Sequence, residues 1–191
     1  MWRLQSHAVA KRLQLWVFLL VLLLCVKRLH AADDTGALQV TVDGEGIAHV
    51  AGTLDLPAGP AKVHEILTDY AHWPALWSGG MAVVAIRQAP EGVIVELLLP
   101  RMWMPGTLRL VIMTHAPTPS PIEARLVSGD FDRFWRVWEL TPTQEGRRTR
   151  AYIEMEVRPT SWVPNWIFSY LVRQQLQDHF ERLRLAVGQG P

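Results

Sequence analysis

The sequence predicts an α+β domain in which a curved antiparallel sheet wraps around a long C-terminal helix. Between residues 81 and 157, short apolar segments are separated by regularly spaced turn residues, which is typical of an antiparallel meander. From Val172 to Val187, apolar residues recur every three or four positions, which predicts one amphipathic helix. A sheet with one apolar face must be covered, and this helix is the only predicted element large enough to do so.

The N-terminal segment, residues 1–32, carries five basic residues and no acidic residue. Residues 13–26 form an apolar run that would reach about 21 Å as a helix, short of the roughly 30 Å core of a bilayer. A basic segment followed by a short apolar run predicts a secretory signal peptide, and therefore a periplasmic or secreted protein. Lys27 and Arg28 directly follow the run, so an uncleaved membrane anchor stays open as the alternative.

The chain after the leader is expected to begin with a strand pair and two short helical segments. Alternating apolar residues predict strands over residues 38–42 and 47–56, separated by a glycine turn. A proline-rich break then leads into a helix with one apolar face over residues 63–70. A further short turn carries Trp73 and Trp77 and ends in two glycines.

Six more strands are expected before the long helix. The last is the clearest, because apolar residues from Ala151 to Val157 alternate with polar ones, so one face is buried and the other is wet. Two prolines follow this strand, and the long helix then runs to Gly188. The six strands are predicted over residues 81–87, 93–99, 107–114, 122–128, 133–141 and 148–157.

Composition excludes several classes of function for the body of the chain, residues 33–191. The whole chain has 19 basic and 18 acidic residues; without the five basic residues of the leader, 14 basic and 18 acidic remain, a net charge of −4. A mildly acidic body argues against nucleic-acid binding. The only cysteine, Cys25, lies in the leader, so the body has no disulfide, thiolate metal site or cysteine nucleophile.

Metal and cofactor motifs give no positive signal. His49, His64, His115 and His179 fall on separate predicted elements without metal-ligand spacing, so no metal site is expected. The glycine pair at residues 44–46 leads into a strand instead of a helix, which fails the dinucleotide-binding context. We therefore expect no cofactor.

One segment carries a family resemblance. LDLPAGPAKVHEILTDYAHWPALW, residues 54–77, resembles the opening of START-like domains of the SRPBCC superfamily, especially the polyketide cyclase and coenzyme-Q-binding branch. The order of the later pieces is similar to that family's later strands and closing helix, so the resemblance covers about residues 47–187. It implies the helix-grip fold, which hosts lipid carriers, quinone binders, cyclases and regulators.

The sequence and the resemblance together favour a ligand-binding function over catalysis. The expected activity is binding or transport of a hydrophobic small molecule, a quinone or a lipid, in an apolar cavity between sheet and helix. A cyclase or dehydrase that orients its substrate in the same cavity is one alternative. A non-catalytic module with a collapsed cavity and a protein partner is the other.

The ligand-binding candidates come from the expected apolar face of the sheet and from the elements above it. Their assignment depends on strand parity, because a one-residue register error moves a whole set to the opposite face. The candidates are Trp73, Trp77, Leu97, Leu99, Trp103, Val111, Met113, Phe134, Trp138, Ile153, Met155, Val172 and Leu176.

Two polar pairs allow a functional and a plain structural interpretation. Asp69 and His72 could form an acid–base couple, but helix capping by Asp69 is favoured. Arg133 and Arg136 flank Trp135 on one strand, and a buried arginine could hold a head group or a quinone carbonyl. The favoured interpretation is a pair of surface arginines that meet glutamates of the neighbouring strand.

Two predicted loops are unusually apolar. Loops are normally polar, so clustered tryptophan and methionine in a loop suggest a cavity mouth or a surface that touches a membrane. We therefore expect the two loops to meet near the cavity entrance and to allow transient membrane contact. Their residues are Met102, Trp103, Met104, Trp162 and Trp166.

Overall fold

The computed structural model describes residues 37–101, 105–118 and 121–188. The predicted leader over residues 1–32 and its boundary with the following domain lie outside the described residues. The strands are β1 (Leu38–Val42), β2 (Ala48–Leu56), β3 (Ala82–Ala89), β4 (Gly92–Pro100), β5 (Thr107–His115), β6 (Ile122–Gly129), β7 (Phe131–Thr143) and β8 (Arg148–Pro159). The helices are α2 (Pro60–Thr68), the 3-10 helix η1 (Tyr70–Leu76) and α3 (Asn165–Gly188).

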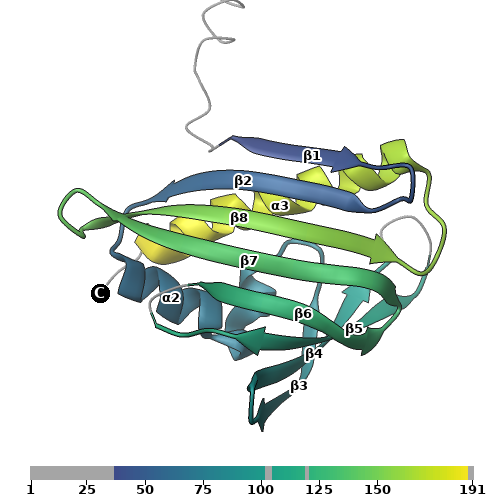
Figure 1. Cartoon of the computed structure of the whole chain (residues 1–191), viewed down its shortest axis with the longest axis horizontal. Helices are drawn as coiled ribbons and strands as arrows, with labels where there is room; N and C mark the ends of the chain where they lie inside the picture. The colour runs from purple at the N-terminus through teal and green to yellow at the C-terminus, as the bar shows by residue number, and fades with distance from the viewer. Residues whose placement is uncertain (1–36, 102–104, 119–120, 189–191) are drawn as a thin grey trace, which may run out of the picture. The chain divides into compact units, whose positions relative to one another are not determined.

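The strands form one eight-stranded sheet in the order β1-β2-β8-β7-β6-β5-β4-β3 (Figure 1). Every pairing is antiparallel. The opening strand pair adds to the last strand, β8, while β3 to β8 follow one another as the predicted meander. The predicted helix-grip α+β fold is confirmed.

Helix α3 lies against the β1, β2 and β8 part of the sheet (Figure 1). Its inward face repeats at the predicted spacing through Leu176, Phe180, Leu183 and Val187, all buried. Burying each such side chain contributes about 1.5–3 kcal/mol. This packing, with the apolar face of β7 included, forms the first of two core clusters.

The second core cluster lies under η1, over β3 to β6. Tyr70, Trp73 and Leu76 of η1 pack there against Val95 and Ile112 of the sheet. One part of the apolar face is therefore covered by α3 together with α2, and the other part by η1. Where η1 and α3 meet, side chains do not completely fill the space above the sheet.

Within the described residues, none of the helices combines the length and the apolar character needed to cross a bilayer.

Candidate functional site

A cavity of about 180 Å³ lies between the two core clusters. Its walls come from η1 and the loop after it, from the inner faces of β4, β5, β7 and β8, and from the first half of α3. Nearly all the lining side chains are apolar, and Arg136 and Gln175 are the polar exceptions. The lining residues are Trp73, Trp77, Gly79, Met81, Leu97, Leu99, Pro100, Leu108, Leu110, Ile112, Phe131, Phe134, Arg136, Met155, Val157, Pro159, Phe168, Leu171, Val172, Gln175 and Leu176.

The two tryptophans of the η1 side are held by specific contacts. Trp73 donates its indole N–H to the carbonyl oxygen of Leu67 at 3.1 Å. Trp77 stacks on His179 of α3, with ring centroids 4.2 Å apart and planes 11° apart. His179 Nδ1 in turn donates to the carbonyl oxygen of Leu76 at 2.9 Å, which ties α3 to η1. These contacts therefore hold η1 and α3 together at the cavity wall.

The half-buried residues Gly79, Leu171, Val172 and Gln175 mark a solvent-facing side of the cavity. A side chain at Gly79 would place its Cβ 2.9 Å from Gln175 Oε1. The Gln175 amide therefore lies directly against the backbone of the loop after η1. Only glycine allows this approach without a shift of Gln175.

Many of the sequence-derived ligand-binding candidates lie in the cavity wall. The alternation of buried and exposed positions on β4, β7 and β8 agrees with the parity assumed for those strands. The candidates that line the cavity are Trp73, Trp77, Leu97, Leu99, Phe134, Met155, Val172 and Leu176. Trp103 and its neighbours Met102 and Met104 lie outside the described residues.

The parity assumed for β5 is wrong. Val111 and Met113 were expected on the inner face, but Leu108, Leu110 and Ile112 line the cavity instead. Both sets on this strand are apolar, so the hydrophobic pattern does not select a face. A register shift opposite β6, between Val111 and Ile112, further interrupts the alternation.

Trp138 and Ile153 have the expected parity but do not line the cavity. Both are fully buried in the first core cluster, under α3. The Trp138 ring lies 6.0 Å from that of Phe180, measured between centroids. The helix therefore covers this part of the inner face, and these two residues serve as core.

Arg136 is the unexpected member of the site, because the sequence favoured a surface position for it. It lies on β7 between Phe134 and Trp138, retains 7% exposure and lines the cavity. Its Cζ lies 5.0 Å from the centroid of the Trp73 ring, a cation–π arrangement. Its Nε has no hydrogen-bond partner among the described residues. Strand parity predicts this inward position, because positions 134 and 138 of the same strand were already assigned to the cavity.

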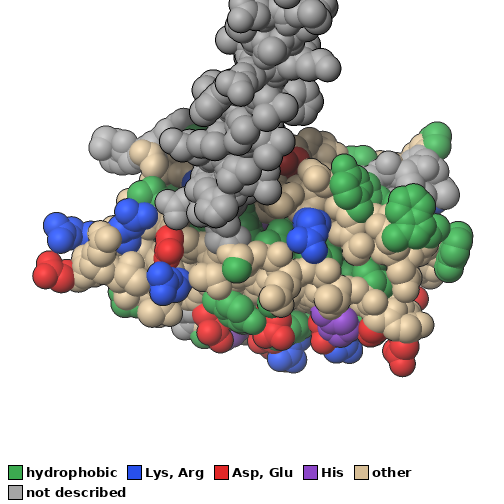
Figure 2. Space-filling model, turned by 90° about the horizontal axis from the view of Figure 1, so that it is seen from above, with side chains coloured by type: hydrophobic (Ala, Val, Ile, Leu, Met, Phe, Trp, Pro, Cys, Tyr) green, Lys and Arg blue, Asp and Glu red, His purple; other side chains and the backbone are tan. Residues whose placement is uncertain are grey.

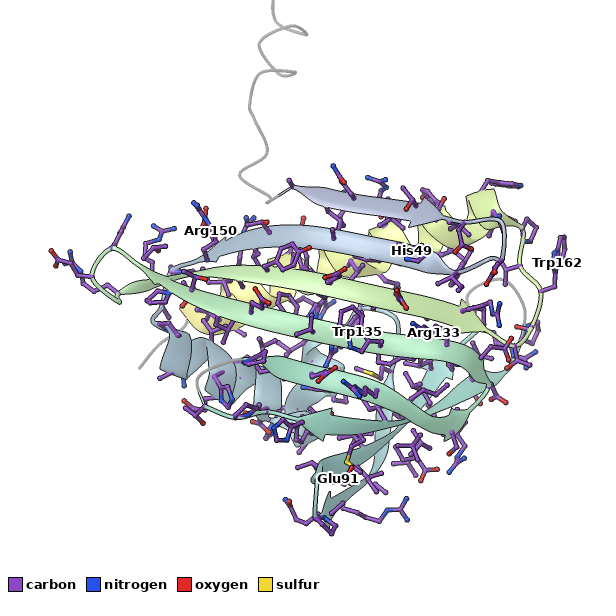
Figure 3. All side chains as sticks on the ribbon, viewed as in Figure 1. His49, Glu91, Arg133, Trp135, Arg150 and Trp162 are labelled. Carbon is purple, nitrogen blue, oxygen red and sulfur yellow. The ribbon has the colours of Figure 1, made fainter. Side chains whose placement is uncertain are left out.

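Arg133 behaves as predicted. It lies on the opposite face of β7, where its Nε donates to Glu156 Oε2 at 2.7 Å. Figure 3 shows Arg133 and Trp135 on the side of the sheet turned away from α3. The favoured interpretation of the arginine pair is therefore confirmed for Arg133 and wrong for Arg136.

Asp69 and His72 form a side-chain pair, with Oδ2 and Nδ1 2.8 Å apart. The favoured capping role of Asp69 is wrong, because its carboxylate makes no capping hydrogen bond. Both side chains are exposed and neither lines the cavity. This pair therefore does not face a ligand bound in the cavity.

Three buried groups have shifted acidities. Burial lowers the pKa of Arg136 to about 10 and that of His179 to about 4, and it raises the pKa of Tyr70. Arg136 is therefore still protonated at neutral pH, and His179 is neutral. Of the three, only Arg136 lines the cavity. Among the described residues, no cluster of His, Cys, Asp and Glu side chains could hold a metal ion.

The comparisons with known proteins agree with this geometry. Residues 48–188 match the family described as "Polyketide cyclase / dehydrase and lipid transport". The chain belongs to this family. The START-like resemblance carried by residues 54–77 is thus confirmed. No curated protein matches the sequence significantly.

Solved structures of low sequence identity share the fold. A START superfamily protein from Mycobacterium smegmatis has a TM-score of 0.60 at 17% identity, covering 74% of this chain and 97% of its own. A STAR-related lipid transfer protein from Xanthomonas axonopodis has a TM-score of 0.56 at 15% identity, covering 80% and 99%. The Zhui aromatase/cyclase from Streptomyces sp. R1128 has a TM-score of 0.54 at 12% identity, covering 74% and 91%. At these identities, the similarity establishes the fold alone.

Proposed function

We propose that this domain binds and carries a hydrophobic small molecule, a quinone or a lipid, in the cavity between η1 and α3. The observation that carries the proposal is the apolar wall, in which aromatic and aliphatic side chains from the sheet and both helical covers face one space. Membership of a family described by cyclases, dehydrases and lipid transport supports the same conclusion. Affinity would come from burial of the ligand's apolar surface, at about 25 cal/mol per Å² before association costs.

The cavity volume limits what can enter. A volume of about 180 Å³ lies below the roughly 300–1,000 Å³ of cavities that bury a drug-sized ligand. The cavity as it stands therefore accommodates a short apolar segment or a single small ring. A long isoprenoid or acyl tail would leave through the side marked by Gly79 and Gln175.

Binding is favoured over acid–base catalysis in the same cavity. A protonated guanidinium cannot act as a general base at neutral pH. Tyr70 and His179 have shifted acidities but do not line the cavity, so no described donor and acceptor pair faces a ligand there. The open cavity also argues against a module whose core has collapsed.

Native mass spectrometry of the protein recovered from its cells, followed by solvent extraction, tests the proposal. Val172→Phe places a ring in the cavity, whereas Leu185→Phe makes a similar change on the exposed face of the same helix. We expect an apolar molecule on the parent and on Leu185→Phe, and occupancy lower by about tenfold on Val172→Phe because the ring overlaps the ligand. Equal occupancy in Val172→Phe would exclude this cavity as the binding site.

We propose that the same protein meets membranes transiently at the start of α3. Trp162 and Trp166 are 83% and 74% exposed, and Tyr170, one turn further along, is 59% exposed. Figure 2 shows hydrophobic side chains gathered at this end of the molecule, and Trp162 projects outward in Figure 3. Indole and phenol rings prefer the membrane–water interface. The same turns contribute Leu171 to the cavity, so contact here would bring the cavity to the lipid surface.

Co-sedimentation with phosphatidylcholine and phosphatidylglycerol vesicles tests this contact. The double variant Trp162→Ser, Trp166→Ser should lose most of its vesicle binding, because each ring contributes apolar area at the interface. Val84→Ser, Ile86→Ser removes exposed apolar side chains from β3 and serves as the matched control. Equal loss in both double variants would refute a contact specific to α3.

Export stays part of the proposal and rests on the leader sequence alone. Intact-mass measurement of protein from the periplasmic fraction should show loss of about the first 31 residues. A full-length mass in the membrane fraction would favour the uncleaved anchor.

A further inference from the structure

We propose that the ligand of the cavity is amphipathic and that a terminal carboxylate of this ligand pairs with Arg136. This inference deepens the proposed function and rests on it, because it names the chemical class bound in the same cavity. It distinguishes an aliphatic carboxylic acid from a neutral quinone.

The position of Arg136 carries the argument. Its side chain is nine-tenths buried, lines the cavity and leaves Nε without a hydrogen-bond partner among the described residues. Arg136 is the only charged residue among the described residues that line the cavity. In the described part of the chain, no salt bridge joins it to a carboxylate. A ligand in the cavity is therefore the available source of a counter-charge.

The surroundings hold the guanidinium in place without neutralising it. Arg136 pairs with Ala124 on one neighbouring strand and with Met155 on the other, so its neighbours across the sheet are uncharged. The Trp73 ring faces the guanidinium at 5.0 Å, and Tyr70 contacts Trp73 edge-on with centroids 5.0 Å apart. An aromatic face stabilises a cation but leaves its N–H donors available. The charge is thus retained, oriented and open to an acceptor.

The chemistry of the acceptor follows from this arrangement. A buried cation without a partner is costly, and an anionic acceptor gains more from it than a neutral carbonyl does. Arginine also presents several N–H donors in a fixed planar arrangement that matches a carboxylate. The depressed pKa of Arg136, which burial lowers to about 10, still leaves it protonated at neutral pH. The apolar remainder of the cavity then takes the aliphatic chain.

Calorimetric titration with octanoate and 1-octanol tests the inference, because the two probes share a chain and differ in the head. The parent should bind octanoate at least about tenfold more tightly than 1-octanol, as expected when a charged hydrogen bond replaces a neutral one. Arg136→Met should lose this preference while it still binds 1-octanol. Arg133→Met, the same change on the outer face of the same strand, should keep the preference.

The outcomes separate this inference from the function on which it rests. Binding of 1-octanol by the parent with equal or weaker binding of octanoate would overturn the carboxylate and leave the apolar cavity supported. Retention of the octanoate preference in Arg136→Met would also overturn it. Failure of the parent to bind 1-octanol at all would instead contradict the cavity as a hydrophobic site. Circular dichroism of each variant shows whether it is folded.

Discussion

Strand β7 carries an arginine and a tryptophan on each of its two faces, and the two pairs differ in their bonding partners. On the outer face, Arg133 pairs with Glu156, and the indole N–H of Trp135 donates to Glu123 Oε1 at 2.8 Å. On the inner face, Arg136 has no carboxylate partner among the described residues, and the indole nitrogen of Trp138 has no hydrogen-bond partner there. The outer arginine and tryptophan each bond to a glutamate, whereas within the described residues neither inner side chain has a carboxylate partner.

This difference supports the proposal that the ligand binds on the inner face. Ion pairs on a solvent-exposed surface contribute little to the free energy of unfolding, so they say little about function. Buried polar groups are normally satisfied, so an exception in a native fold requires an explanation. On the inner face of β7 the exception of Arg136 coincides with a cavity, which agrees with the anionic ligand proposed for that cavity. Trp138 lies deeper, in the core, and its role is packing.

The largest expected effect is on stability and separates the two tryptophans. Trp138→Ala should lower the free energy of unfolding by about 3–5 kcal/mol, because a fully buried indole is removed and the space stays partly empty. Trp135→Ala, on the half-buried outer face, should cost about 1 kcal/mol, mainly through its hydrogen bond to Glu123. Urea denaturation measures both. Similar losses would show that the two faces of β7 are equally packed.

The next effect has the opposite sign and concerns the buried arginine. Arg136→Met should raise the free energy of unfolding of the ligand-free protein by about 1–3 kcal/mol, because a desolvated charge gives way to an apolar side chain of similar length. The same variant is the one expected to lose the octanoate preference. Stability gained together with selectivity lost is the signature of a binding group. A large destabilisation would instead make Arg136 a structural residue.

The burial of His179 on the inner side of the sheet makes the free energy of unfolding depend on pH. Its pKa is about 4 when folded and 6.5 in its ordinary state, because burial disfavours the charged form. The unfolded chain therefore binds the proton more tightly, and stability is complete above pH 6.5 and is lost as the pH falls toward 4. Between pH 7 and pH 5 the loss should be about 2 kcal/mol. His179→Gln should flatten this part of the profile; an unchanged slope would assign it to other groups.

The same contrast explains what the sequence could and could not predict. Element order, the meander and the inward face of β8 follow from local alternation, so they were predictable. The inner face of β5 was not, because Leu110 and Val111 are equally apolar and a register shift lies beside them. Parity placed Trp138 and Ile153 inward correctly. Whether an inward side chain meets the cavity or α3 depends on where the helix docks, which local patterns do not encode.

Arg136 was missed for a different reason. Its parity matched that of Phe134, but a charged residue was assigned to the surface by the general rule that charges are solvated. The rule fails where a site needs a buried charge, so disagreement between strand parity and residue polarity is itself a signal of function.

The smallest expected effect completes the comparison on the outer face. Arg133→Met removes an exposed ion pair with Glu156, so the free energy of unfolding should fall by less than about 1 kcal/mol. Because salt screens exposed charges, the difference from the parent should shrink further between 50 mM and 500 mM sodium chloride. The stability change of Arg136→Met should be much less sensitive to salt, since its charge is buried. Denaturation at the two salt concentrations measures both variants. Equal salt sensitivity would mean that solvent ions reach Arg136, and the inner guanidinium would then need no anionic ligand to balance its charge.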